Sequence, residues 1–103
     1  MPDTDATEHV SLDNLAEGSR QSLFEAGPRT VRLALDAGED VPAHRHSDRN
    51  IVCHLVAGEL VLGLGSETVA LSAGEVVRFD GDQDISLRAE TDCEALLVLS
   101  PAV

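Results

Sequence analysis

Short apolar runs alternate with turn residues along most of the chain, and Val, Leu and Ile supply most of their members. The β-branched residues among them, Val and Ile, favour pleated strands. The runs recur at intervals of about ten residues, a spacing typical of a sandwich or barrel of antiparallel strands. We therefore predict an all-β fold with strands at residues 21–24, 30–35, 51–56, 59–64, 68–71, 76–79, 85–88 and 95–99.

The segments outside these runs predict turns and one short helix. Gly65-Ser66 suits a two-residue hairpin of type II′, because Gly accepts the positive φ that this turn requires. Ahead of the first run, Ser11 is a candidate cap for one or two helical turns that end at Gly18. Residues 1–8 are polar and acidic and have nothing to bury, so we expect them to fray.

A chain of 103 residues has the usual size of one domain. We expect residues 1–18 to form an acidic tail with a short helical turn, and residues 19–103 to form a single β-barrel domain. No apolar run approaches the roughly 20 residues that cross a bilayer, and the acidic N-terminus is unlike a secretory signal. These features predict a soluble, cytoplasmic protein.

The charge balance narrows the choice of partners. The chain has 19 acidic residues and 7 basic ones, all of them Arg, for a formal net charge of −12. Nucleic-acid binding depends on Lys and Arg that neutralise phosphates, so this surface would repel nucleic acid and anionic membranes. We predict neither as a partner. A strongly acidic chain without Lys is typical of halophilic archaeal proteins, in which salt screens exposed carboxylates.

The most informative stretch runs from Gly38 to His46 and ends in His44-Arg45-His46. In a strand, residues two apart lie on one face, so both imidazoles would point the same way. Neutral imidazole is the commonest protein ligand for transition metals, so the pair is a candidate site for Fe, Mn, Ni, Cu or Zn. The alternative is a pair of exposed or hydrogen-bonded histidines without a ligand.

This stretch resembles the first motif of the cupin superfamily, which runs Gly, five residues, His-x-His, three or four residues, Glu, six residues and Gly. The chain has Gly38, His44, His46 and Gly58 at these positions, and Gly74 begins the family's second motif. The resemblance covers most of the chain beyond the acidic tail. It implies a cupin double-stranded β-helix, a jelly-roll-like barrel of eight or more short antiparallel strands, with a pocket inside.

Two of the four positions that hold a metal in this family carry other residues. Ile51 stands at the position of the Glu in the first motif, and Ile85 at that of the His in the second. The resemblance therefore implies that a divalent ion keeps only His44 and His46, and losing ligands lowers metal affinity by orders of magnitude. Ile51 and Ile85 would instead make the pocket floor apolar.

Four nearby residues are possible additions to the site. Cys53 has the strand parity of Ile51, so it is either a thiolate in the pocket or a small buried hydrophobe. His54 belongs on the opposite face unless a bulge precedes Ile51 and returns it to the pair. Arg45 and Arg49 flank the histidines and either pair with acids or hold a carboxylate ligand. Cys53 and Cys93 lack the spacing of zinc or redox motifs and are expected to be reduced.

Three functions remain open at this point. The first is non-catalytic binding of a small molecule in a pocket formed by Ile51, Cys53 and Ile85, with His44 and His46 as its polar wall. The second is a metal-dependent enzyme of the oxygenase or isomerase kind that uses the two histidines as ligands. The third is a structural or interaction role as a homodimer, which small size and several edge strands also favour. The sequence assigns no catalytic residue.

Overall fold

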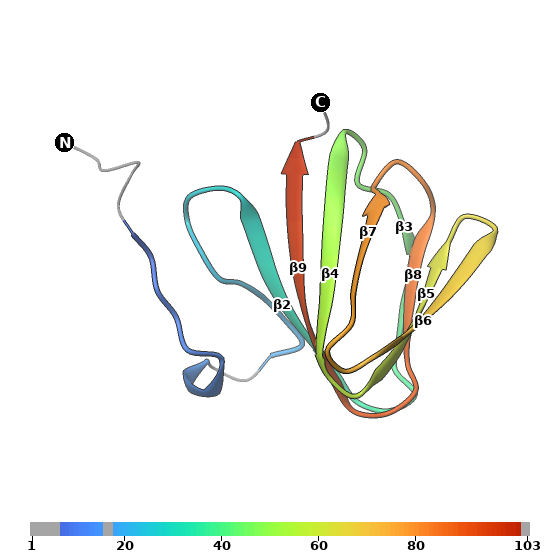
Figure 1. Ribbon diagram of the computed structural model, residues 1–103, viewed down its shortest axis with the longest axis horizontal. Coiled ribbons are helices and arrows are strands. Elements are labelled where there is room, and N and C mark those ends of the chain that lie inside the picture. The colour runs from blue at the N-terminus through green and yellow to red at the C-terminus, as the bar shows by residue number, and fades with distance from the viewer. Residues whose placement is uncertain (1–6, 16–17, 102–103) are drawn as a thin grey trace.

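The computed structural model describes residues 7–15 and 18–101 of the chain. Within these residues, a single turn of 3-10 helix, η1 (Leu12–Asn14), precedes nine strands (Figure 1). The strands are β1 (Arg20–Ser22), β2 (Arg29–Leu35), β3 (Asp40–His44), β4 (Arg49–Ala57), β5 (Glu59–Leu64), β6 (Glu67–Ser72), β7 (Val76–Asp80), β8 (Ile85–Ala89) and β9 (Cys93–Pro101). No helix in the described ranges is long and apolar enough to span a membrane.

The strands form two sheets that enclose the core. One sheet has five strands in the order β1-β2-β9-β4-β7, and the other has four in the order β3-β8-β5-β6. Every pairing is antiparallel, and strands far apart in sequence, such as β4 and β9, lie side by side (Figure 1). The all-β, jelly-roll-like fold predicted from the sequence is confirmed.

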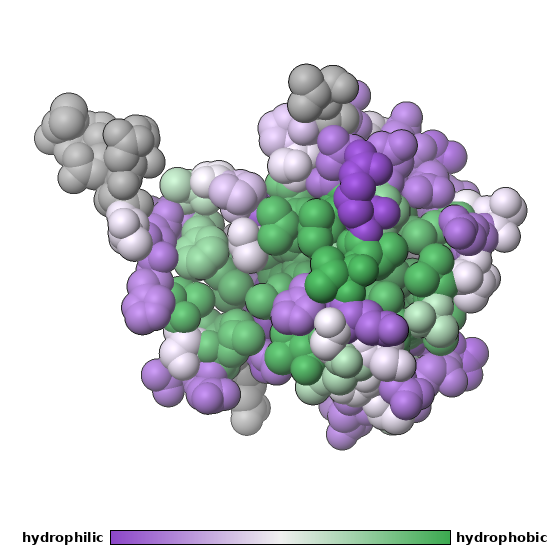
Figure 2. Space-filling view, in the orientation of Figure 1, coloured by the Kyte–Doolittle hydropathy of each residue, from purple (hydrophilic) through white to green (hydrophobic). Residues whose placement is uncertain are grey.

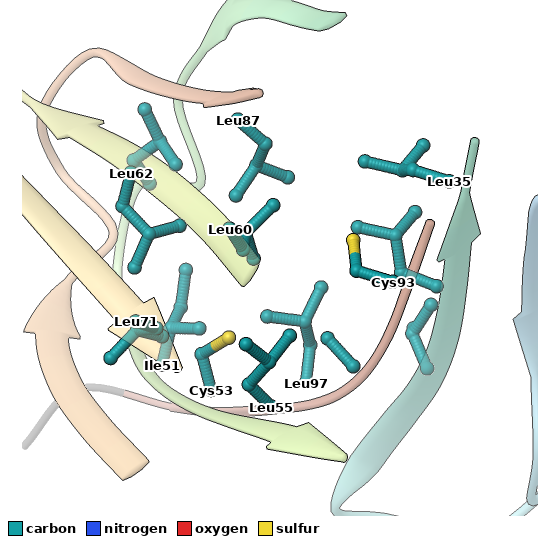
Figure 3. Packing of buried hydrophobic residues seen from close by; sticks show 14 of the residues in the cluster. Leu35, Ile51, Cys53, Leu55, Leu60, Leu62, Leu71, Leu87, Cys93 and Leu97 are labelled. Atoms are coloured by element: carbon teal, nitrogen blue, oxygen red, sulfur yellow. The ribbon is translucent and has the colours of Figure 1, made fainter. Parts of the chain in front are cut away.

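Strict alternation of inward and outward residues builds the core. Along β9 every second residue is buried, beginning with Cys93 and ending with Leu99. Figure 3 shows Leu55 of β4 on the opposite side of the core from Leu60 and Leu62 of the four-stranded sheet. A fully buried Leu contributes about 2 kcal/mol, so a one-residue slip of the register would be costly. On the face seen in Figure 1, hydrophobic side chains gather near the centre and hydrophilic ones surround them (Figure 2).

Two local features differ in detail from the prediction. The helical turn is a 3-10 helix of three residues, Leu12–Asn14, and residues 16–17 of the predicted turn lie outside the described ranges. The strand β3 was not predicted at all. Its residues are half-buried or exposed without strict alternation, and Pro42 interrupts the run, which is tolerated because β3 is an edge strand of its sheet.

Two glycines allow parts of the backbone to come close together. Gly58, between β4 and β5, has a φ of 86°, and a Cβ atom there would overlap the carbonyl oxygen of Asp92. Gly81 follows β7, and a Cβ atom there would overlap the carbonyl oxygen of His46. The Gly81 N–H donates to the Arg49 carbonyl oxygen (2.8 Å), and the His46 N–H donates to the Gly81 carbonyl oxygen (2.8 Å). Gly81 therefore holds the segment between β3 and β4 against the end of β7.

Candidate functional site

A small pocket lies between the two sheets, close to where β4 begins and β9 ends. Three polar side chains line it, those of Arg20, His44 and His46, and we refer to it as the histidine pocket. Its other lining residues are apolar: Ile51, Phe79, Ile85, Leu87, Leu97 and Leu99. Its volume is about 20 Å³, room for about one water molecule. A ligand would therefore lie mainly across the mouth, with only a small group inside.

A β-bulge aims His44 into this pocket. Val41 of β3 lies opposite Leu87 of β8, and His44 lies opposite Ile85, so three steps along β3 match two along β8. Leu87 and Ile85 are both buried, so the extra residue turns His44 inward, where simple alternation would turn it outward. The His44 Nδ1 lies 3.0 Å from the carbonyl oxygen of Pro42 and donates to it, which leaves Nε2 for a ligand.

His46 reaches the same pocket from outside the strand. β3 ends at His44, so the two histidines do not share one strand, and strand alternation is not what brings them together. The hydrogen bond from the His46 N–H to Gly81 instead anchors the loop that carries it. The two imidazole rings lie edge to face, with centroids 4.7 Å apart and planes at 83°. The pair is thus assembled by a bulge and a loop anchor.

Burial and charge together keep the His46 imidazole neutral. Burial is the largest cause that lowers its pKa, followed by the positive charges of His44, Arg20, Arg29 and Arg49. Because the ordinary pKa of histidine is about 6.5, a lowered pKa leaves the ring uncharged at pH 7. A neutral imidazole has one donor and one acceptor nitrogen, so His46 can bond to either kind of ligand atom.

The donor set does not fit a tightly held metal ion. The side chains at the other two ligand positions of the cupin resemblance, Ile51 and Ile85, are hydrocarbon and line the pocket. Across residues 7–15 and 18–101, no three His, Cys, Asp or Glu side chains are grouped in a way that could hold a metal. The neighbouring arginines also oppose a second positive charge. Two imidazoles alone would hold a divalent ion weakly.

Cys53, a predicted pocket residue, does not line the histidine pocket. It lies two residues further along β4 than Ile51 and is completely buried, opposite Val77 of β7 and Leu97 of β9 (Figure 3). Burial raises the pKa of its thiol to about 12, so the side chain is protonated at pH 7. Cys53 behaves as a small hydrophobic residue of the core, which was the alternative interpretation of the sequence. Cys53 and Cys93 are both free thiols.

His54 lies on the outer face of the five-stranded sheet, away from the pocket. It pairs with Val76 of β7 and Leu96 of β9, whose side chains are not part of the core. The register shift of β4 falls between Leu55 and Ala57, after His54, so it does not turn this ring inward. His54 is therefore unable to complete a metal site with the other two histidines.

Several lining residues were missed from the sequence. Phe79 and Leu99 both lie opposite Ile51, one on each neighbouring strand, so their place follows from pairing partners that the sequence does not specify. Strand parity was the available signal, because Phe79 is two residues from the half-buried Val77. Arg20 comes from β1, a three-residue strand whose position depends wholly on its pairing with β2.

A second, wider depression of about 580 Å³ lies at the opposite end of β2 and β9. Its lining includes four acidic residues: Asp36, Glu39, Asp92 and Glu94. Glu39 and Asp92 accept hydrogen bonds from backbone N–H groups of the β2–β3 loop (2.7 and 2.8 Å), and Glu94 pairs with Arg32 (2.7 Å). Because three of these four carboxylates already have partners, the histidine pocket is the stronger candidate for a ligand site.

The family of the chain follows from its sequence match. Residues 31–100 match the model of the cupin domain, and the chain therefore belongs to this family. A search of curated proteins finds no match. Members of a fold family carry many unrelated activities, so membership leaves the function to be argued from the pocket.

Solved structures of other cupins resemble this chain. The cupin domain of Cnp3 from Schizosaccharomyces pombe has a TM-score of 0.81 at 13% identity, covering 90% of this chain and 73% of that one. An RmlC-like cupin protein from Desulfovibrio desulfuricans has a TM-score of 0.77 at 19% identity, covering 95% and 99%. A protein described as a predicted oxalate decarboxylase from Thermotoga maritima has a TM-score of 0.65 at 27% identity, covering 71% and 65%.

Proposed function

We propose that this protein binds a small organic molecule at the histidine pocket without converting it chemically. The composition of the pocket is the observation that supports this function most. Six apolar side chains form its floor and walls, and two imidazoles lie among the few polar groups at its mouth. Sites for small molecules usually combine an apolar cavity with a few convergent polar groups in this way.

The alternative is a metal-dependent cupin enzyme of the oxygenase or isomerase kind, whose metal ion is held by His44 and His46. The Thermotoga maritima protein is described as an enzyme, so structural likeness by itself selects neither function. Ile51 and Ile85 favour binding, since a catalytic metal needs ligands at these positions or substitutes for them. The homodimer and the halophilic setting expected from the sequence remain predictions.

Titration followed by NMR tests the binding function. Small acids, amides and alcohols are added to the folded protein in high salt while the imidazole resonances of its histidines are recorded. We expect members of this panel to shift the resonances of His44 and His46 and to leave that of His54 unchanged, because His54 lies on the outer face. A panel in which no compound shifts the two pocket histidines would contradict the proposal.

Elemental analysis tests the alternative on the same protein, purified without chelator or affinity tag. Less than stoichiometric transition metal is expected. Near-stoichiometric Fe, Mn, Ni, Cu or Zn that disappears in the His44→Ala, His46→Ala double variant would favour the metal-dependent enzyme. The His54→Ala variant is the matched control, because it removes an imidazole that is remote from the pocket.

A further inference from the structure

Three of the seven arginines differ from the rest because their guanidinium groups have no described side-chain partner. The other four guanidinium groups bond to acids or an amide: Arg32 to Glu94, Arg45 to Asp82 and Asp84, Arg78 to Asn50, and Arg88 to Glu90. Within residues 7–15 and 18–101, the guanidinium groups of Arg20, Arg29 and Arg49 form no hydrogen bond or ion pair. The chain has 19 acidic residues for these 7 arginines, so carboxylates are not in short supply.

Strand pairing puts all three on the core-facing side of the five-stranded sheet. Arg20 lies opposite Leu33 and Arg29 lies opposite Leu99, and both leucines are buried. Residues paired across two strands share a face of the sheet. Arg49 precedes the buried Ile51 by two residues and therefore also shares its face. The three side chains are exposed and lie on the side of the sheet that forms the histidine pocket, which Arg20 lines.

Two of the arginines lie on either side of the end of β9. Arg29 begins β2 and Arg49 begins β4, and β9 runs between these strands. Arg29 pairs with Leu99 and Arg49 with Pro101, so two strand spacings and an offset of two residues put their Cα atoms about 12 Å apart. Their long side chains can therefore reach a common ligand above the last residues of β9, where Leu99 lines the histidine pocket.

The charges that act on His46 at the mouth of the pocket are positive, in a protein whose formal net charge is −12. Arg20, Arg29 and Arg49 are, with His44, the charges that act on the His46 ring, and no described carboxylate acts against them. Exposed charges are partly screened by salt, but several that converge at one place add up. An anion at the mouth is therefore attracted, whereas it is repelled over most of the surface.

We propose that the ligand of the histidine pocket is a small organic acid whose carboxylate is bound by Arg29 and Arg49, with Arg20 adding positive charge beside the pocket. This inference rests on the proposed function and narrows its ligand to one chemical class. A planar guanidinium binds a carboxylate through two parallel N–H···O bonds, and these donors have no described partner to give up first. The apolar end of the acid contacts Ile51 and Phe79, where the cavity of about 20 Å³ admits only a small group.

Three small molecules distinguish the effect of ligand charge on binding from the effect of ligand shape. Butyrate and butyramide have almost equal shape but differ in charge, and inorganic phosphate has charge without an apolar end. Each is titrated into the folded protein at constant ionic strength, and the resonances of His44 and His46 are followed. We expect butyrate to bind at least about tenfold more tightly than butyramide or phosphate, which is the usual effect of a charge-assisted hydrogen bond.

Substitution of the arginines assigns the effect to this cluster. Arg29→Gln and Arg49→Gln should each weaken butyrate binding by roughly tenfold and leave butyramide binding unchanged. Arg78→Gln removes the same charge from the outer face of the same sheet and should change neither. Circular dichroism of each variant checks that the exposed substitutions leave the fold intact.

Each contrary result has a separate meaning. Equal binding of butyrate and butyramide would overturn the organic-acid proposal and leave the ligand pocket standing. Equal losses in the Arg78→Gln and Arg49→Gln variants would attribute the attraction to total charge and would also overturn it. Phosphate binding as tight as that of butyrate would make this a simple anion site. If none of the three probes, nor any compound of the wider panel, shifts the pocket histidines, the proposed function fails as well.

Discussion

The two ends of strands β2 and β9 carry charges of opposite sign, and they differ in whether these charges have bonding partners. At one end, Glu39 and Asp92 accept hydrogen bonds from the backbone of the β2–β3 loop, so their carboxylates stabilise the fold. At the other end, Arg29 and Arg49 bond to no described side chain and face the histidine pocket. The comparison separates charges that hold the chain together from charges that are available to a ligand.

Thiol labelling compares the acidic end with the core beside the histidine pocket, and it has the largest expected effect. Cys93 lines the acidic depression and is 7% exposed, with a pKa raised by burial, whereas Cys53 is 0% exposed and burial raises its pKa to about 12. At pH 8 only about one in ten thousand Cys53 thiols would be ionised, so alkylation should be very slow. We expect Cys93 to react at least about tenfold faster in the folded protein, measured by mass spectrometry of peptides. Equal rates before denaturation would contradict the sealed position of Cys53.

The substitution Gly81→Ala tests the backbone contact that anchors the pocket end. The added Cβ would overlap backbone atoms of His46, so we expect a loss of about 2 kcal/mol in the free energy of unfolding. The resonance of His46 should shift as well. Gly27→Ala is the control, because a Cβ at that glycine has no atom within 4 Å. Free energies of unfolding are measured with denaturant. Equal losses in the two variants would show that the close contact at Gly81 does not determine stability.

The smallest expected effect is a difference in stability between two variants, each of which removes one charge from one end. Asp92→Ala leaves the Ala37 N–H without its acceptor and should lower the free energy of unfolding by about 1 kcal/mol. Arg49→Gln should change it by less than about 0.5 kcal/mol, because the guanidinium has no described partner. Both are measured by denaturant unfolding in high salt, which limits the influence of net charge. A large loss in the Arg49 variant would reveal a structural role and remove the difference between the two ends.

The sequence predicts most of the fold because alternation and turn residues are local signals. The run at residues 59–64 coincides with β5, since Gly58 and Gly65 mark both of its ends. The edge strand β3 is missed because its pattern is exposed and irregular. Local signals therefore suffice for central strands, whose two faces differ, and fail for an edge strand that buries little.

The site is predictable only as far as the motif extends. The cupin motif indicates His44, His46, Ile51 and Ile85, and the structure places these four residues around one cavity. The three arginines come from β1, β2 and β4, and their convergence depends on pairings between distant parts of the chain. Parity with buried neighbours was a usable hint for Arg29 and Arg49. Only the sheet order turns that hint into a location.

The two isoleucines of the pocket show that the fold and the chemistry of the site are determined by different residues. Ile51 and Ile85 lie on strands whose register already directs their side chains toward the two imidazoles. Glu at position 51 and His at position 85, the residues of the cupin motifs, would add two metal ligands beside the imidazoles. The barrel thus fixes where these side chains point, and the side chains at two positions decide what the pocket can hold.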